Sequence, residues 1–133
     1  MLPGVIMADA LGGVDRNQEA LALIQRLLAE STTPEVGVFV SELWRIRGQL
    51  VLRESAGNSP QAEHYLATAL RIADEQGANV FRLRAGIVLA RLLAERGRRE
   101  EARSVLSHAD TNRLDAWRGP EIAIATQLRS ELG

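Results

Sequence analysis

The segment that decides the fold is Glu42-Leu43-Trp44-Arg45-Ile46-Arg47-Gly48-Gln49-Leu50-Val51-Leu52-Arg53. Its apolar residues, with those just before it, recur at intervals of three and four, which is the period of one helix face. That face consists of Val36, Phe39, Val40, Leu43, Ile46 and Leu50, with Trp44 on its flank. We therefore expect a long helix from Pro34 to about Ser55, with Trp44 in the core.

The composition favours an all-α protein of one domain, residues 1–133. Only 4% of the residues are aromatic, and Ala, Leu, Arg and Glu, which favour helices, dominate the sequence. A chain of this length buries enough surface to fold without covalent cross-links. The chain contains no cysteine, which fits a reducing compartment, so we expect a cytoplasmic protein.

The charge of the chain argues against partners that attract proteins by bulk electrostatics. The formal net charge is -1, so we expect neither nucleic acid nor a membrane surface as a partner. The apolar opening segment 2–11 contains Asp9 and is shorter than the roughly 20 residues of a membrane span.

Proline and glycine divide the chain into helical segments. Proline suits the first turn of a helix, and Pro34, Pro60 and Pro120 each precede an apolar pattern. Glycine readily takes the left-handed conformation that closes a helix, as we expect for Gly77 and Gly97. The expected helices are residues 2–11, 16–30, 34–55, 60–76, 79–96, 99–107 and 120–132, and the polar segment 108–119 is expected to be a loop or a frayed extension of the helix before it.

Small residues recur at nearly constant spacing and indicate three helix pairs. Equivalent places in the first helices hold Ala8, Gly48 and Ala90, and those in the second helices hold Ala20, Ala62 and Ala102. The separations are 40 and 42 residues in the first set and 42 and 40 in the second. A small residue lets two helix backbones approach closely where they cross. We expect antiparallel pairs at about 2–30, 34–77 and 79–107, and a capping helix at about 120–132.

This pattern resembles the tetratricopeptide repeat, a family of helix pairs that stack into a superhelix. The matching residues are Trp44, Gly48, Ala62, Leu66 and Ala69. The period is near 41 residues instead of 34, and Leu66 replaces the family's aromatic residue, so the version in this chain is lengthened and divergent. Segments 42–52, 62–77, 83–92 and 97–102 more particularly resemble the C-terminal repeat region of bacterial signalling regulators of the cyclase/ATPase and LuxR types.

The resemblance implies a non-catalytic module that binds or scaffolds a protein or peptide, as the sensing or assembly arm of a signalling or transcriptional regulator. Neither a phosphate-binding loop nor cyclase metal carboxylates occur in the sequence. Two alternatives stay open. One is a free-standing regulator that self-associates through its terminal helices, and the other is a sensor of an anionic small ligand or peptide.

In tetratricopeptide arrays the first helices line a concave groove, and the resemblance implies which residues would line it here. The predicted groove residues are Glu42, Arg45, Gln49, Arg53, Arg84 and Arg91, with Asp9 and Glu95 at further outward positions. Arg45, Arg84 and Arg91 would clamp a carboxylate through charge-assisted hydrogen bonds. The alternative is an ordinary solvated face on which Glu42 and Glu95 neutralise their neighbours.

Other chemistry-bearing residues give weaker signals. Trp117 is a candidate interface residue, since exposed tryptophan often marks a contact surface. His64 and His108 have no second ligand at helical spacing, and Gly12-Gly13 follows no strand, so we interpret that pair as a turn. We therefore predict no catalytic, metal or cofactor site.

Overall fold

The computed structural model describes residues 17–30, 37–54, 59–109 and 120–133. These ranges contain six α-helices and no strand, so the prediction of an all-α protein is confirmed. The helices are α2 (Asn17–Ala29), α4 (Val40–Glu54), α5 (Ser59–Gln76), α6 (Asn79–Glu95), α7 (Arg99–Ala109) and α8 (Pro120–Leu132).

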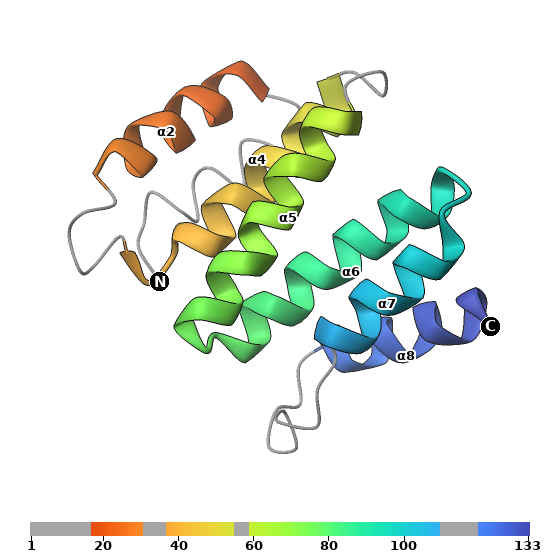
Figure 1. Cartoon of the computed structure of the whole chain (residues 1–133). Coiled ribbons are helices and arrows are strands. Elements are labelled where there is room, and N and C mark those ends of the chain that lie inside the picture. Colours follow the sequence, from red (N-terminus) through yellow and green to blue (C-terminus); the bar gives the residue numbers. More distant parts are fainter. Residues whose placement is uncertain (1–16, 31–36, 55–58, 110–119) are drawn as a thin grey trace.

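Successive helices from α4 to α7 lie side by side and run in opposite directions (Figure 1). Between α4 and α5 the direction follows from two contacts: the hydroxyl of Ser41 donates to the carbonyl of Ala69 at 2.9 Å, and Gly48 lies against Ala62. On one side of this row α2 packs against α4, and on the other side α8 packs against α6 and α7.

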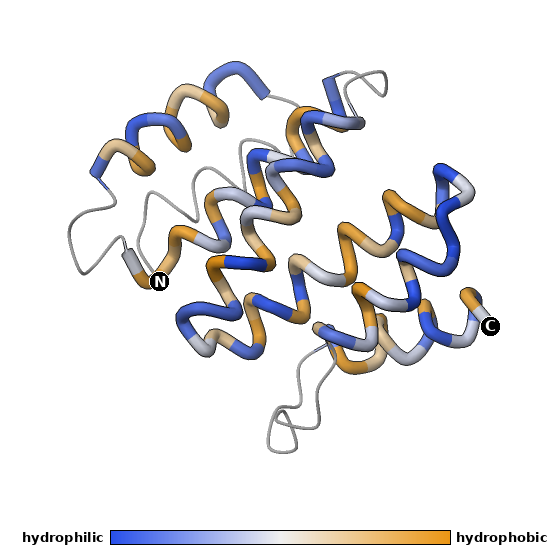
Figure 2. Tube along the Cα trace, viewed as in Figure 1, coloured by the Kyte–Doolittle hydropathy of each residue, from blue (hydrophilic) through white to orange (hydrophobic). Residues whose placement is uncertain are grey.

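The two predicted glycine turns are confirmed. Gly77 and Gly97 have φ angles of +65° and +79°, in the region that only glycine enters without strain. Behind Gly77 the amide of Ala78 donates to the carbonyl of Ala73 at 2.9 Å, so a carbonyl left open by the helix end finds a donor. The polar α6–α7 connection around Gly97 appears as a hydrophilic stretch in Figure 2.

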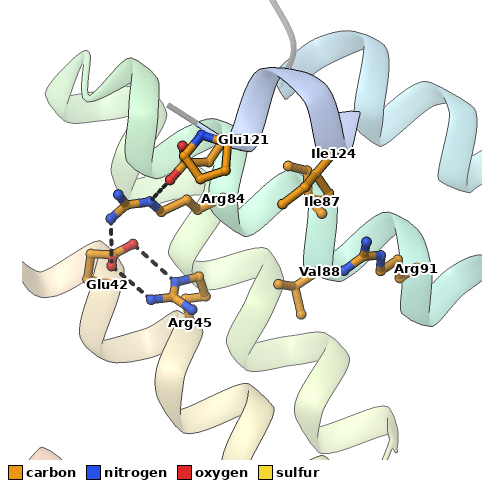
Figure 3. Close-up of a pocket in the computed structure, with 9 residues that line it drawn as sticks. Glu42, Arg45, Arg84, Ile87, Val88, Arg91, Glu121 and Ile124 are labelled. Carbon is orange, nitrogen blue, oxygen red and sulfur yellow. Dashed lines mark hydrogen bonds and ion pairs between the residues drawn. The ribbon is translucent and has the colours of Figure 1, made fainter. Parts of the chain in front are cut away.

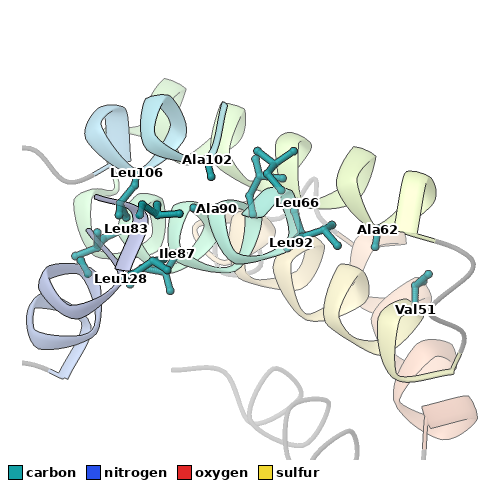
Figure 4. Packing of buried hydrophobic residues seen from close by; sticks show 14 residues of the cluster. Val51, Ala62, Leu66, Leu83, Ile87, Ala90, Leu92, Ala102, Leu106 and Leu128 are labelled. Atoms are coloured by element: carbon teal, nitrogen blue, oxygen red, sulfur yellow. The ribbon is translucent and has the colours of Figure 1, made fainter. Parts of the chain in front are cut away.

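The apolar side chains form two clusters that meet at α4. The larger cluster joins α4 to α8 and includes Leu66, Leu83, Leu106 and Leu128 (Figure 4). The smaller cluster packs Ile24 and other residues of α2 against Leu43, Ile46 and Leu50 of α4. Helix α4 therefore packs against the two clusters with two different faces.

Small residues lie where neighbouring helices approach closely, but the position predicted for one of these approaches was wrong. Ala20, Ala62, Ala90 and Ala102 are fully buried, whereas Ala8 lies outside the described residues. Between α6 and α7, however, the closest approach falls at Gly86, where an added Cβ would stand only 2.2 Å from the Cβ of Ala109. The prediction missed this place because it matched Ala90 to Gly48 by spacing alone.

Three boundaries and placements differ from the prediction. The expected helix from Pro34 does not run on into α4, since Val38 and Phe39 form a turn and α4 begins at Val40. Gly37 disfavours a continuous helix, and its carbonyl instead accepts a 2.9 Å hydrogen bond from the side chain of Gln76.

Helix α7 continues to Ala109, two residues beyond the expected end at Ser107, because Ala109 is fully buried where it packs on Gly86.

Trp44 is half-buried and does not belong to the core. Its ring lies 5.4 Å from that of Tyr65, and the guanidinium of Arg47 stacks over both rings. An indole accommodates such a position because only part of its surface needs to leave water.

Candidate functional site: a groove between α4, α6 and α8

The site is organised around a buried carboxylate. Glu42, in the first turn of α4, is only 1% exposed. Arg45, one turn later, donates to both of its oxygens: Nη2 lies 2.8 Å from Oε2 and Nε lies 3.1 Å from Oε1. Arg84 of α6 adds a third hydrogen bond, from Nη1 to Oε2 at 3.3 Å. A buried carboxylate needs such donors, because burial without them would be very costly.

Arg84 extends this network to α8. Its Nε donates to Oε1 of Glu121 at 2.6 Å, so one guanidinium joins carboxylates from two helices (Figure 3). The network of Glu42, Arg45, Arg84 and Glu121 therefore links α4, α6 and α8 and carries two positive and two negative charges. Arg45 also donates to Gln49, one turn further along α4.

Burial and carboxylates act on Arg84 in opposite directions. Partial burial lowers its pKa, but the hydrogen bonds and charges of Glu121 and Glu42 outweigh that effect, so the pKa is raised above the ordinary arginine value. A raised pKa stabilises the folded state at every pH below the ordinary value, and this contribution is lost only as the pH rises through the higher folded value. Arg84 is therefore charged throughout the physiological range.

A hollow of about 360 Å³ lies beside the network. Its apolar lining comes from Ile87 and Val88 of α6 and from Pro120 and Ile124 of α8. In Figure 3 the side chains of Ile87 and Ile124 lie next to each other, to the right of the Arg84–Glu121 pair. The four network residues and Arg91 complete the lining.

A second hollow of about 320 Å³ continues along α4 and α6. Its lining residues are Gln49, Leu52, Arg53, Val88, Arg91, Leu92 and Glu95. Val88 and Arg91 line both hollows, which therefore adjoin. We call the surface formed by the two hollows the groove.

The facing residues of the groove keep a constant register. Glu42 pairs with Arg84, 42 residues later, and the second hollow is lined by Gln49 and Arg53 of α4 and, 42 residues after each of them, by Arg91 and Glu95 of α6. Helices α4 and α6 therefore line the groove in the same direction and in step. From Glu42 to Arg53 a helix rises about 16 Å, which matches roughly five residues of an extended chain.

All six predicted groove residues line this surface, and Glu42 neutralises Arg45 and Arg84, as the alternative to the anion clamp predicted. Glu42 is buried and not an outward residue. Arg45 and Arg84 are already paired with carboxylates, so they do not form an open anion clamp with Arg91. The reason is that helix spacing identified the face, whereas the spacing carried no sign that α8 would bring Glu121 to Arg84.

The contribution of α8 is what sequence reasoning missed. This helix was expected only to cap the end of the chain, yet Pro120, Glu121 and Ile124 line the first hollow. The apolar pattern predicted the helix but not which neighbour its first turn would meet.

The remaining candidates do not form a second site in the described structure. His108 pairs with Asp74 across α5 and α7, with Nε2 2.7 Å from Oδ2. The described residues contain no group of His, Asp and Glu that would hold a metal ion, and none of their helices is long and apolar enough to cross a membrane. Trp117, Asp9 and Gly12-Gly13 lie outside the described residues.

Comparison of the chain with known protein families, curated proteins and solved structures found no match.

Proposed function

We propose that this chain is a non-catalytic interaction module that holds an extended segment of a partner protein in the groove. The observation that carries the proposal is the pair of adjoining hollows along α4 and α6, which are lined by both apolar and charged side chains. Peptide grooves commonly combine apolar pockets, which supply affinity, with a few placed polar groups, which orient the bound segment.

The proposal includes a tetratricopeptide-like stack as the architecture. It is supported by the antiparallel succession of α4 to α7 and by the 42-residue register across the groove. Helix α8 then stands beside α6 as α6 stands beside α4, so the groove spans three neighbouring helices. A sensing or assembly arm of a bacterial signalling or transcriptional regulator is the role that we propose for such a module.

Selection from a random-peptide library displayed on phage tests the docking function. The variant Val88→Arg places a long charged side chain in both hollows and is expected to abolish enrichment of the peptides that the unchanged protein selects. Val38→Arg is the matched control, because Val38 is 55% exposed and lies outside the groove. Circular dichroism establishes that both variants are folded. Equal enrichment by Val88→Arg and Val38→Arg would refute the docking function.

The volume of the first hollow supports a second candidate, a small-ligand sensor. About 360 Å³ lies within the range of roughly 300 to 1,000 Å³ that is usual for small-molecule sites. Thermal-shift measurements with small carboxylic acids test it: this candidate requires a rise in melting temperature that Arg91→Gln removes. Against it, two of the three arginines at this hollow are already neutralised by Glu42 and Glu121.

A further inference from the structure

We propose that the groove selects segments in which an acidic side chain pairs with Arg91 and an apolar side chain, two residues away, fills the first hollow. This inference rests on the proposed docking function and names the chemistry of the partner. It assigns the recognition of charge to one arginine, and not to the arginine cluster as a whole.

The charged residues of the groove show why Arg91 is the proposed partner of an acidic ligand group. Seven charged residues line the two hollows: four arginines, at positions 45, 53, 84 and 91, and three glutamates, at positions 42, 95 and 121. Four of the seven belong to the internal network, whose charges cancel. Arg91 is exposed and makes no hydrogen bond or ion pair with any residue in the described ranges. Its guanidinium is therefore available to an anionic group.

The position of Arg91 favours an acidic side chain within a segment over a terminal carboxylate. Arg91 lines both hollows, so a bound chain that meets it has room to continue on either side.

The spacing of the two ligand groups follows from helix geometry. Arg91 stands four residues after Ile87 and three after Val88, so its Cβ atom shares one helix face with theirs at a distance of about 5 to 6 Å. In an extended chain, side chains two residues apart point to the same side and are separated by roughly 6 to 7 Å. An apolar residue and an acidic residue separated by one other residue therefore match the groove.

The decisive experiment compares the peptides that four proteins select from the same phage library. The unchanged protein is expected to enrich the apolar–any–acidic pattern. Arg91→Gln is expected to lose the acidic preference, and Arg91→Glu is expected to favour a basic residue at that place. The control is Arg71→Gln, because Arg71 lies on α5 outside the groove and pairs with Glu75.

The strongest selected peptide is then synthesised with a fluorescent label, alongside an analogue in which an amide replaces the acidic group. Fluorescence anisotropy is expected to show about tenfold weaker binding of the original peptide to Arg91→Gln, which is the scale of one lost charge-assisted hydrogen bond. The amide analogue is expected to bind equally to both proteins.

The possible failures separate the two proposals. Enrichment that depends on Val88 but shows no acidic preference, or an acidic preference that survives in Arg91→Gln, overturns the inference and leaves the docking function standing. A preference for peptides with a free C-terminal carboxylate at Arg91 also overturns it. Selection that does not depend on Val88 removes both proposals.

Discussion

Among the glycines that the structure describes, Gly86 is the one at which an added side chain would have the least room. A Cβ added there would meet the Cβ of Ala109 at 2.2 Å, whereas one added at Gly48 would meet the side chain of Leu66 at 2.9 Å. The closest neighbour of Gly86 is fixed to the backbone of α7, whereas the closest neighbour of Gly48 is the fully buried side chain of Leu66, with the carbonyl of Ala62 at 3.3 Å. The two glycines therefore differ in how much room an added methyl group would have.

We predict that Gly86→Ala destabilises the protein by about 1 to 3 kcal/mol, the usual cost of overpacking, even though alanine is the better helix former by roughly 1 kcal/mol. Gly48→Ala should cost less, because an added Cβ would come no closer than 2.9 Å to a neighbouring side chain, against 2.2 Å at Gly86. Urea unfolding followed by circular dichroism measures both changes.

Adding Ala109→Gly to Gly86→Ala should restore part of the lost stability, because it removes the methyl group that clashes. Equal stability of the Gly86→Ala and Gly48→Ala variants would contradict this account of the α6–α7 contact.

Glu42 is the other residue whose surroundings make a sharp prediction. Replacement by glutamine keeps its size but leaves the guanidinium groups of Arg45 and Arg84 without a shared carboxylate. We expect a loss of about 2 kcal/mol in the free energy of unfolding, below the full cost of breaking a buried pair because both arginines are partly solvated. The matched control is Glu75→Gln: that ion pair is exposed and should contribute less than about 1 kcal/mol. Urea titrations of the two variants measure both losses, and equal losses would contradict the prediction.

The sequence predicted the boundaries of the described helices better than it predicted which helices contact one another. Periodicity and the glycine signals at Gly77 and Gly97 depend on local residues, so the boundaries of α5 and α6 were predicted closely. The start of α4 was wrong because the apolar pattern runs on through Val38 and Phe39, which form a turn directly after Gly37. The pairing of Glu121 with Arg84 was missed because separate helices had to position the two partners.

The helices also differ in how thoroughly they are covered. Helix α6 packs against α4, α5, α7 and α8, whereas α2 packs chiefly against α4. We therefore predict that amide hydrogens in α2 exchange with solvent faster than those in α6, because local opening is easier where fewer contacts must break. Hydrogen exchange followed by mass spectrometry measures the difference.

Ile24→Ala, which removes a fully buried side chain of the α2 cluster, should speed exchange in α2 and leave the rates in α6 nearly unchanged. A matching acceleration in both helices would show that the two clusters open together.

The described surface of the molecule bears on self-association. The alternative of a regulator that self-associates through its first and last helices needs an apolar surface, and the expected first helix, residues 2–11, lies outside the described residues. Val38 is the sole large hydrophobic residue that the described ranges leave exposed, and it does not belong to the last helix, α8. We expect a monomer at micromolar concentrations. Light scattering across a concentration series checks this, and a mass that rises with concentration would favour the self-association hypothesis.

Helix α8 is held at both of its ends, and this constrains its length. Glu121 in its first turn meets Arg84, and the carbonyl of Leu132 at its end accepts a 2.8 Å hydrogen bond from Nε of Arg103. One residue inserted between these anchors would turn everything after it by about 100° and advance it by about 1.5 Å. Glu121 and the carbonyl of Leu132 could then no longer reach Arg84 and Arg103 at the same time. The number of residues in α8 is therefore as strongly specified as their identities, so insertions and deletions within it should be tolerated far less well than substitutions on its exposed face.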